Sequence, residues 1–216
     1  MIEYLKIENF GPIDEVILDD IRPLTVFIGE SGSGKSTIMK VLSLFRWMYK
    51  RVNLRSYLQH AGIKKTRIGF KIQNLMKTSG IAEYLKQFRS EMNVGEIKDR
   101  NVHIFVEEPE LSLYPESQKS LMDFLVDRCF NHSRDYHMTL MIATHSPYIV
   151  NYLNLLIKRN EAADHTPYKM AFEDVNVYEI CGGTACSLRM DDGYRIINAT
   201  SLSDPISSIY KEYNAL

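Results

Sequence analysis

The feature that most constrains this chain is a glycine-rich loop at residues 29–36. Gly29, Gly34, Lys35 and Ser36 match the pattern G-x-x-x-x-G-K-[ST] without a mismatch, at the end of an apolar run. Glycines let the backbone curl so that successive N–H groups point at phosphate oxygens, and a helix beginning near Lys35 adds the positive end of its dipole. The loop therefore predicts a strand, a phosphate-binding turn and a helix, in that order.

The residues of this loop have separate expected roles. Lys35 should reach the β- and γ-phosphates of a nucleotide, and the Ser36 hydroxyl is placed to ligate the accompanying magnesium ion. The other expected nucleotide-binding residues are Gly29, Glu30, Ser31, Gly32, Ser33, Gly34 and Thr37. A Gly/Ser turn that matches by chance is the alternative, but the strand before it and the amphipathic helix after it favour ATP with Mg²⁺.

Length and composition indicate one well-cored domain. The chain has 216 residues, of which 45% are hydrophobic, and it shows no internal repeat. No apolar run approaches the ~20 residues of a membrane span, and the N-terminus lacks the layout of a secretory signal, so we expect a cytoplasmic protein without a membrane partner. The three cysteines form no C-x-x-C pair and are expected to be reduced thiols.

The net charge of −1 hides an uneven distribution. Residues 31–82 contain eleven Lys or Arg and no Asp or Glu, which leaves 26 − 11 = 15 basic against 27 acidic residues elsewhere. Such asymmetry indicates a nucleic acid or an acidic partner near residues 31–82. The alternative is a solvated face, since no aromatic-interleaved binding motif accompanies the charge.

Hydrophobic periodicity predicts an α/β fold, with a mixed sheet flanked by helices and an antiparallel hairpin ahead of the loop strand. The expected strands span residues 2–8, 16–18, 24–28, 67–72, 102–106, 139–143, 175–180 and 184–188. The expected helices begin near Lys35 and Pro115 and span residues 81–92, 148–157 and 204–216. Residues 51–77 give no clear pattern apart from the possible strand at 67–72.

Two of these strands end in residues that carry chemistry. Glu107 and Glu108 follow the strand at 102–106, where one carboxylate can help to hold magnesium and the other can polarise the water that attacks the γ-phosphate. We assign the metal role to Glu107 and the base role to Glu108, against the alternative of a surface turn. His145 follows the strand at 139–143, so it should reach the same sheet edge and hydrogen-bond the γ-phosphate.

Three segments together carry a family resemblance. Residues 29–36, 104–115 (IFVEEPELSLYP) and 143–148 (ATHSPY) resemble the ABC-class ATPases of the RecF and SMC type. Within that class the chain is most similar to the prokaryotic stand-alone AAA family ATPases found beside nucleases in antiviral defence operons, including the ATPase subunit of Septu. The resemblance implies a single ABC-ATPase-like P-loop head over residues 1–216. It also implies Glu107 in place of the Walker B aspartate, Glu108 as the base and His145 as the switch histidine.

The same resemblance implies two further motifs. Ser79 and Gly80 stand where the family has a Ser-Gly signature that completes the site of the opposite subunit in a head-to-tail dimer, although a helix cap is the alternative. Gln73 stands at the place of the Q-loop glutamine that meets the metal, although a solvent-facing glutamine is equally expected. Only five residues separate Gln73 from Ser79, so residues 51–80 are the expected site of a reduced or missing helical arm.

The leading functional prediction is an ATPase that dimerises, or forms a higher homo-oligomer, around Mg-ATP and thereby controls an effector protein. A nuclease is the expected effector. It should be on another chain, because this sequence contains no H-N-H-like constellation. The alternatives are the ATP-binding subunit of a membrane transporter, which normally carries a full Leu-Ser-Gly-Gly-Gln signature, and a P-loop kinase for a small molecule. A zinc site at Cys129, His132 and His137 lacks a fourth ligand.

Overall fold

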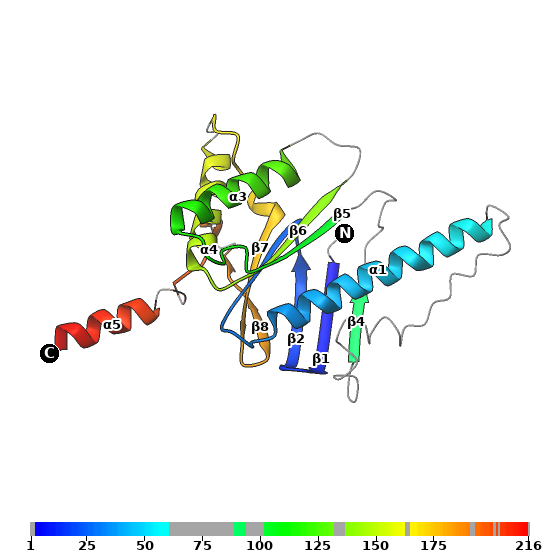
Figure 1. The fold of residues 1–216 in the computed structure, drawn as a ribbon, viewed down its shortest axis with the longest axis horizontal. Coiled ribbons are helices and arrows are strands. Elements are labelled where there is room, and N and C mark those ends of the chain that lie inside the picture. The colour runs from blue at the N-terminus through cyan, green and yellow to red at the C-terminus, as the bar shows by residue number, and fades with distance from the viewer. Residues whose placement is uncertain are drawn as a thin grey trace.

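The fold is built on a five-stranded sheet with the order β5-β6-β3-β7-β8 (Figure 1). The computed structural model describes residues 3–60, 89–93, 102–131, 137–162, 165–190, 193–200, 202 and 204–215. The five strands are β3 (Leu24–Ile28), β5 (Val102–Glu107), β6 (Met138–Thr144), β7 (Val175–Cys181) and β8 (Thr184–Ser187). The first four are parallel, and β8 pairs antiparallel with β7 across the predicted hairpin.

A second, antiparallel sheet has the order β2-β1-β4. Its strands are β1 (Glu3–Phe10), β2 (Ile13–Ile21) and β4 (Arg89–Asn93). The expected N-terminal hairpin is therefore present. The helix predicted over 81–92 is wrong for residues 89–92, which form a strand, because β4 pairs with β1 along its length and this tertiary pairing overrides the local helical pattern.

Helices α3 (Pro115–Phe130) and α4 (Pro147–Glu161) connect parallel strands, from β5 to β6 and from β6 to β7. Helix α1 (Lys35–His60) follows β3, and α5 (Asp204–Ala215) extends away from the rest at the end of the chain in Figure 1. A 3₁₀ turn, Phe172–Asp174, and the short strands β9 (Arg189–Met190) and β10 (Ile196–Ile197) complete the fold. Helix α1 continues past residue 51, where the sequence pattern is weak, because no Gly or Pro interrupts the chain between Gly34 and Gly62.

The central sheet is buried on both faces, which confirms the predicted α/β class. Alternate residues of β3 point to opposite sides: Val26 and Ile28 join a core formed with α3 and α4, whereas Phe27 joins a core formed with α1 and the antiparallel sheet. All five residues of β3 are buried. The strand that leads into the phosphate loop is thus the most enclosed element of the fold, and it gives the loop a fixed base.

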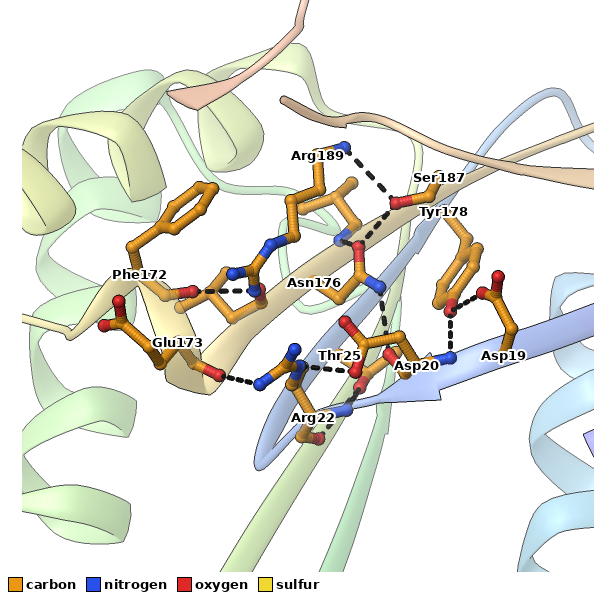
Figure 2. A network of polar contacts seen from close by, with 12 residues as sticks. Asp19, Asp20, Arg22, Thr25, Phe172, Glu173, Asn176, Tyr178, Ser187 and Arg189 are labelled. Atoms are coloured by element: carbon orange, nitrogen blue, oxygen red, sulfur yellow. Dashed lines mark hydrogen bonds and ion pairs between the residues drawn. The ribbon is translucent and has the colours of Figure 1, made fainter. Parts of the chain in front are cut away.

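A polar network holds the antiparallel sheet against β7 (Figure 2). The Tyr178 hydroxyl accepts a hydrogen bond from the Asp20 N–H at 3.0 Å and donates to Asp19 Oδ1 at 3.2 Å. Asn176 Nδ2 donates to the Asp20 carbonyl oxygen at 2.9 Å. Burial raises the pKa of the Tyr178 phenol, so it stays neutral and keeps its donor. The network fixes the C-terminal end of β2 against β7.

Candidate active site

The phosphate loop is packed between the β1–β2 hairpin and β7, and two of its glycines are required there. Gly29 has φ +154°, and a Cβ at this position would lie 2.2 Å from the carbonyl oxygen of Ile180. Gly34 has φ +107°, and its Cβ would lie 3.0 Å from Ile13 Cγ1. Since the Ile180 oxygen belongs to the backbone of a buried strand, it cannot give way to a larger residue.

The ammonium group of Lys35 lies inside the curl of this loop. Its Nζ donates hydrogen bonds to the carbonyl oxygens of Gly29 at 2.8 Å and Glu30 at 2.7 Å. Burial lowers the pKa of Lys35, and the nearby carboxylates of Glu108 and Glu110 oppose that effect. A cation held at the centre of the loop by two neutral carbonyls can move to phosphate oxygens, which are the stronger acceptors.

Ser36, in the first turn of α1, meets Glu107 at the end of β5. The distance from Ser36 Oγ to Glu107 Oε2 is 3.0 Å, and both side chains are accessible from solvent. A hydroxyl and a carboxylate oxygen side by side are the donors that Mg²⁺ takes from a protein when phosphate and water supply the remaining ligands. The residues present therefore fit a magnesium ion at this position.

Glu108 and His145 face each other across the ends of β5 and β6. His145 Nε2 lies 3.3 Å from Glu108 Oε1. The backbone N–H of Glu108 donates to the Ala143 carbonyl oxygen at 2.8 Å, which extends the β5–β6 ladder one residue past β5. Glu108 adopts φ +47°, an unusual conformation for a residue with a side chain, and the chain turns sharply here. The structure thus brings together two of the three side chains predicted to be catalytic, the third being Lys35 in the loop.

The sequence interpretation missed Glu110 and its partners. Glu110 Oε1 accepts hydrogen bonds from Thr144 Oγ1 at 2.8 Å and from the backbone N–H of His145 at 2.7 Å. The run Glu107-Glu108-Pro109-Glu110 is a visible signal in the sequence. Its acceptor role is not visible, because the donors lie 34 and 35 residues further along the chain.

A cavity of about 380 Å³ opens beside the loop. Its lining includes Gly29, Glu30 and Ser33 of the loop, His145 after β6, and Cys181 in the β7–β8 hairpin. It therefore connects the phosphate loop with the end of β6 on the side where α4 begins.

Several predicted site residues lie outside the described part of the chain. These are Gln73, Ser79 and Gly80, together with Lys64, Lys65, Arg67, Lys71 and Lys77 of the basic segment, so their roles stay predictions. The three cysteines are free, as expected. Within the described ranges no group of three or more His, Cys, Asp or Glu side chains could hold a metal ion, and no helix is long and apolar enough to cross a membrane.

Comparison with known proteins gives the family. The model of the AAA ATPase domain family matches residues 1–47 and 48–150, which is more than half of the chain. The chain belongs to the AAA ATPase domain family, and its activity is ATP hydrolysis. This agrees with the predicted resemblance to AAA family ATPases.

No curated protein matches the chain. Among solved structures, it is similar to the ATP-binding cassette MJ1267 of an ABC transporter, with 17% identity, a TM-score of 0.47, and coverage of 97% of this chain and 99% of that one.

Proposed function

We propose that the chain is an ABC-type ATPase that hydrolyses ATP at the carboxyl edge of its parallel sheet. The observation that carries this proposal is the convergence of three strand ends. Ser36 meets Glu107 at 3.0 Å, and Glu108 meets His145 at 3.3 Å, beside the loop that encloses Lys35. A phosphate clamp, a pair of metal donors, a base and a hydrogen-bonding histidine are the parts that phosphoryl transfer to water needs.

Each side chain has a step in this mechanism. Lys35 leaves the Gly29 and Glu30 carbonyls for the β- and γ-phosphate oxygens and stabilises the charge that develops on them. Ser36 and Glu107 would hold magnesium, which when bound would further stabilise that phosphate charge. Glu108 accepts the proton of the attacking water, and His145 hydrogen-bonds the γ-phosphate.

We also propose that a second copy of the chain closes over the carboxyl edge of the parallel sheet, where the catalytic residues lie. Large apolar side chains that closely follow Glu108 and His145 in sequence are exposed: Leu111 is 71% exposed, Tyr114 83% and Tyr148 57%. Such a group beside a polar site is typical of a surface that becomes buried on association. In a head-to-tail dimer or a higher homo-oligomer, Ser79 and Gly80 of one copy would complete the site of the other.

We propose that this nucleotide-dependent closure controls an effector on a separate chain, with a nuclease in antiviral defence or DNA transactions as the expected type. The basis is the resemblance of residues 29–36, 104–115 and 143–148 to the stand-alone ATPases of defence operons, such as that of Septu. The basic segment at residues 31–82 is the proposed contact for a nucleic acid.

Glu108→Gln tests the proposal most directly. Glutamine keeps the size and hydrogen bonding of the side chain but cannot accept a proton, so turnover should fall by about 10² or more while ATP still binds. With Mg-ATP the variant should elute as a dimer in gel filtration. Glu116→Gln is the matched control, because Glu116 is a carboxylate exposed by 90% at the start of α3. Normal turnover in Glu108→Gln would refute the base assignment.

A further inference from the structure

We infer that Glu110 is the positioning residue of His145: it fixes the backbone of the histidine that faces the proposed base. This inference rests on the proposed function, because it assigns Glu110 a role in the same hydrolytic site. Glu110 touches neither Glu108 nor the phosphate loop through a described hydrogen bond. The described hydrogen bonds of its side chain go to the chain at the end of β6.

One oxygen of Glu110 serves two consecutive residues. Oε1 accepts from the Thr144 hydroxyl at 2.8 Å and from the His145 backbone N–H at 2.7 Å. Hydrogen bonds to a carboxylate are shorter and stronger than those between neutral groups, so this pair is a firm restraint. The Thr144 side chain is fully buried, whereas His145 is exposed. Glu110 therefore holds the chain at the end of β6, between the buried Thr144 and the exposed His145 of the proposed active site.

The restraint continues into α3. Thr144 Oγ1 also accepts the Ser146 N–H at 2.9 Å, and Ser146 Oγ donates to Gln118 Oε1 at 2.5 Å. Gln118 Nε2 in turn donates to the Leu113 carbonyl oxygen at 3.0 Å. Thr144, Ser146 and Gln118 are all buried. Residues on both sides of His145 are thus tied to the segment that follows the Glu107–Glu108 pair.

This arrangement sets the distance between the two proposed catalytic groups. Glu108 and Glu110 are two residues apart on one turn, which is closed by hydrogen bonds from Leu111 N to Glu108 O at 3.0 Å and from Leu113 N to Glu110 O at 2.8 Å. The turn that carries Glu108 also carries Glu110, and Glu110 binds the backbone of His145. The same turn therefore positions both Glu108 and the histidine that faces it. The 3.3 Å separation of His145 Nε2 and Glu108 Oε1 depends on that anchor.

A double-mutant cycle with His145 separates positioning from simple stabilisation. Glu110→Ala should lower kcat roughly 10-fold and leave the Kd for ATP within about twofold of the parent, because the Glu110 side chain makes no described hydrogen bond to the phosphate loop. In the His145→Ala background the same change should have almost no further effect on kcat. Full additivity of the two effects would overturn the inference. Glu116→Ala is the matched control and should behave as the parent.

Conservative variants sharpen the test. Glu110→Gln retains an oxygen that can accept both hydrogen bonds, so it should recover most of the lost kcat. Glu110→Asp is one methylene shorter and should behave like Glu110→Ala. If Glu110→Ala does not fold, Glu110→Asp takes its place in the double-mutant cycle. A glutamine variant as slow as the alanine variant, at equal thermal stability, would contradict the assignment.

Amide hydrogen exchange tests, without ATP, whether Glu110 holds the backbone of His145. In Glu110→Ala the His145 N–H loses its acceptor and should exchange at least about 10-fold faster, while amides within β3 should be unchanged. Unchanged exchange at His145 would overturn the inference whatever the kinetics show. Absence of ATP hydrolysis by the parent protein would refute the proposed function instead, and the exchange measurement would then decide the role of Glu110 alone.

Discussion

The Ser36 hydroxyl lies 3.0 Å from the Glu107 carboxylate, although 71 residues separate them in the chain. Ser36 is fixed by the first turn of α1, and Glu107 by β5, at the edge of the sheet. Strands β5, β6 and β3 run parallel, with Glu107 opposite Ala143 and Ala143 opposite Phe27. Their carboxyl ends therefore reach one edge together.

Replacing the loop lysine should abolish nucleotide binding. Lys35→Ala removes the cation that Gly29 and Glu30 hold in place for the β- and γ-phosphates, so calorimetry should detect no ATP binding where the parent binds. The fold should persist, because Lys35 contacts only the loop through its described hydrogen bonds. If Lys35→Ala bound ATP as tightly as the parent, the assignment of the loop would be wrong.

Gly29→Ala should destabilise the protein as well as block nucleotide binding. The new Cβ would lie 2.2 Å from the Ile180 carbonyl oxygen, so β3 and β7 would have to separate locally. We expect the free energy of unfolding in urea to fall by about 2 kcal/mol or more. Gly32→Ala is the control: its φ is +79°, but its Cβ would meet no atom within 4 Å, so it should lose only about 1 kcal/mol. Equal losses in the two variants would contradict the packing argument.

Acid should destabilise the fold through His103. Its Nδ1 shares a hydrogen bond with Thr139 Oγ1 at 2.8 Å, and burial, with Arg46 and Lys50 nearby, lowers its pKa from 6.5 to about 4. Between these values the unfolded chain binds the proton and the folded chain does not. The free energy of unfolding should therefore fall as the pH drops from 6.5 towards 4, by up to about 3 kcal/mol.

Urea denaturation at several pH values measures this effect. His103→Asn cannot titrate and should flatten the profile across the same interval, with the remaining slope due to other groups. A variant profile as steep as that of the parent would show that another residue is responsible.

The basic segment predicts salt-sensitive binding of a nucleic acid. Not every charge in it is free for a partner: Arg46 is only 4% exposed and pairs with Glu3, and Lys35 lies in the phosphate loop. If nucleic acid binds, log K should fall by roughly 0.7 to 0.9 per log unit of salt for each phosphate neutralised. Replacing Lys64, Lys65 and Arg67 with Gln should reduce that slope and leave ATP binding unchanged.

Gel filtration at two salt concentrations, with and without nuclease, distinguishes the kinds of partner. A complex that survives both the higher salt and the nuclease would indicate an acidic protein and would exclude the nucleic acid.

Local sequence was sufficient for the phosphate loop and the elements around it. The strand at Leu24–Ile28 and the helix that begins at Lys35 are as predicted, because a buried strand, a glycine turn and a helix start each have short-range signatures. The positions of Glu107, Glu108 and His145 at strand ends could also be predicted, since parallel strands deliver their carboxyl ends to one edge.

Tertiary structure alone decided the remaining features. Residues 89–92 have a helical pattern but form part of β4, because β1 offers them a backbone partner. The motif indicates glycine at position 29, but the carbonyl oxygen of Ile180 that leaves no room for a Cβ there is 151 residues away in sequence, and Glu110 finds its donors beyond α3. Periodicity and motifs report what a residue does with its near neighbours. Hydrogen bonds and close approaches between distant segments depend on how the sheets and helices pack, and the sequence carries no local signal for them.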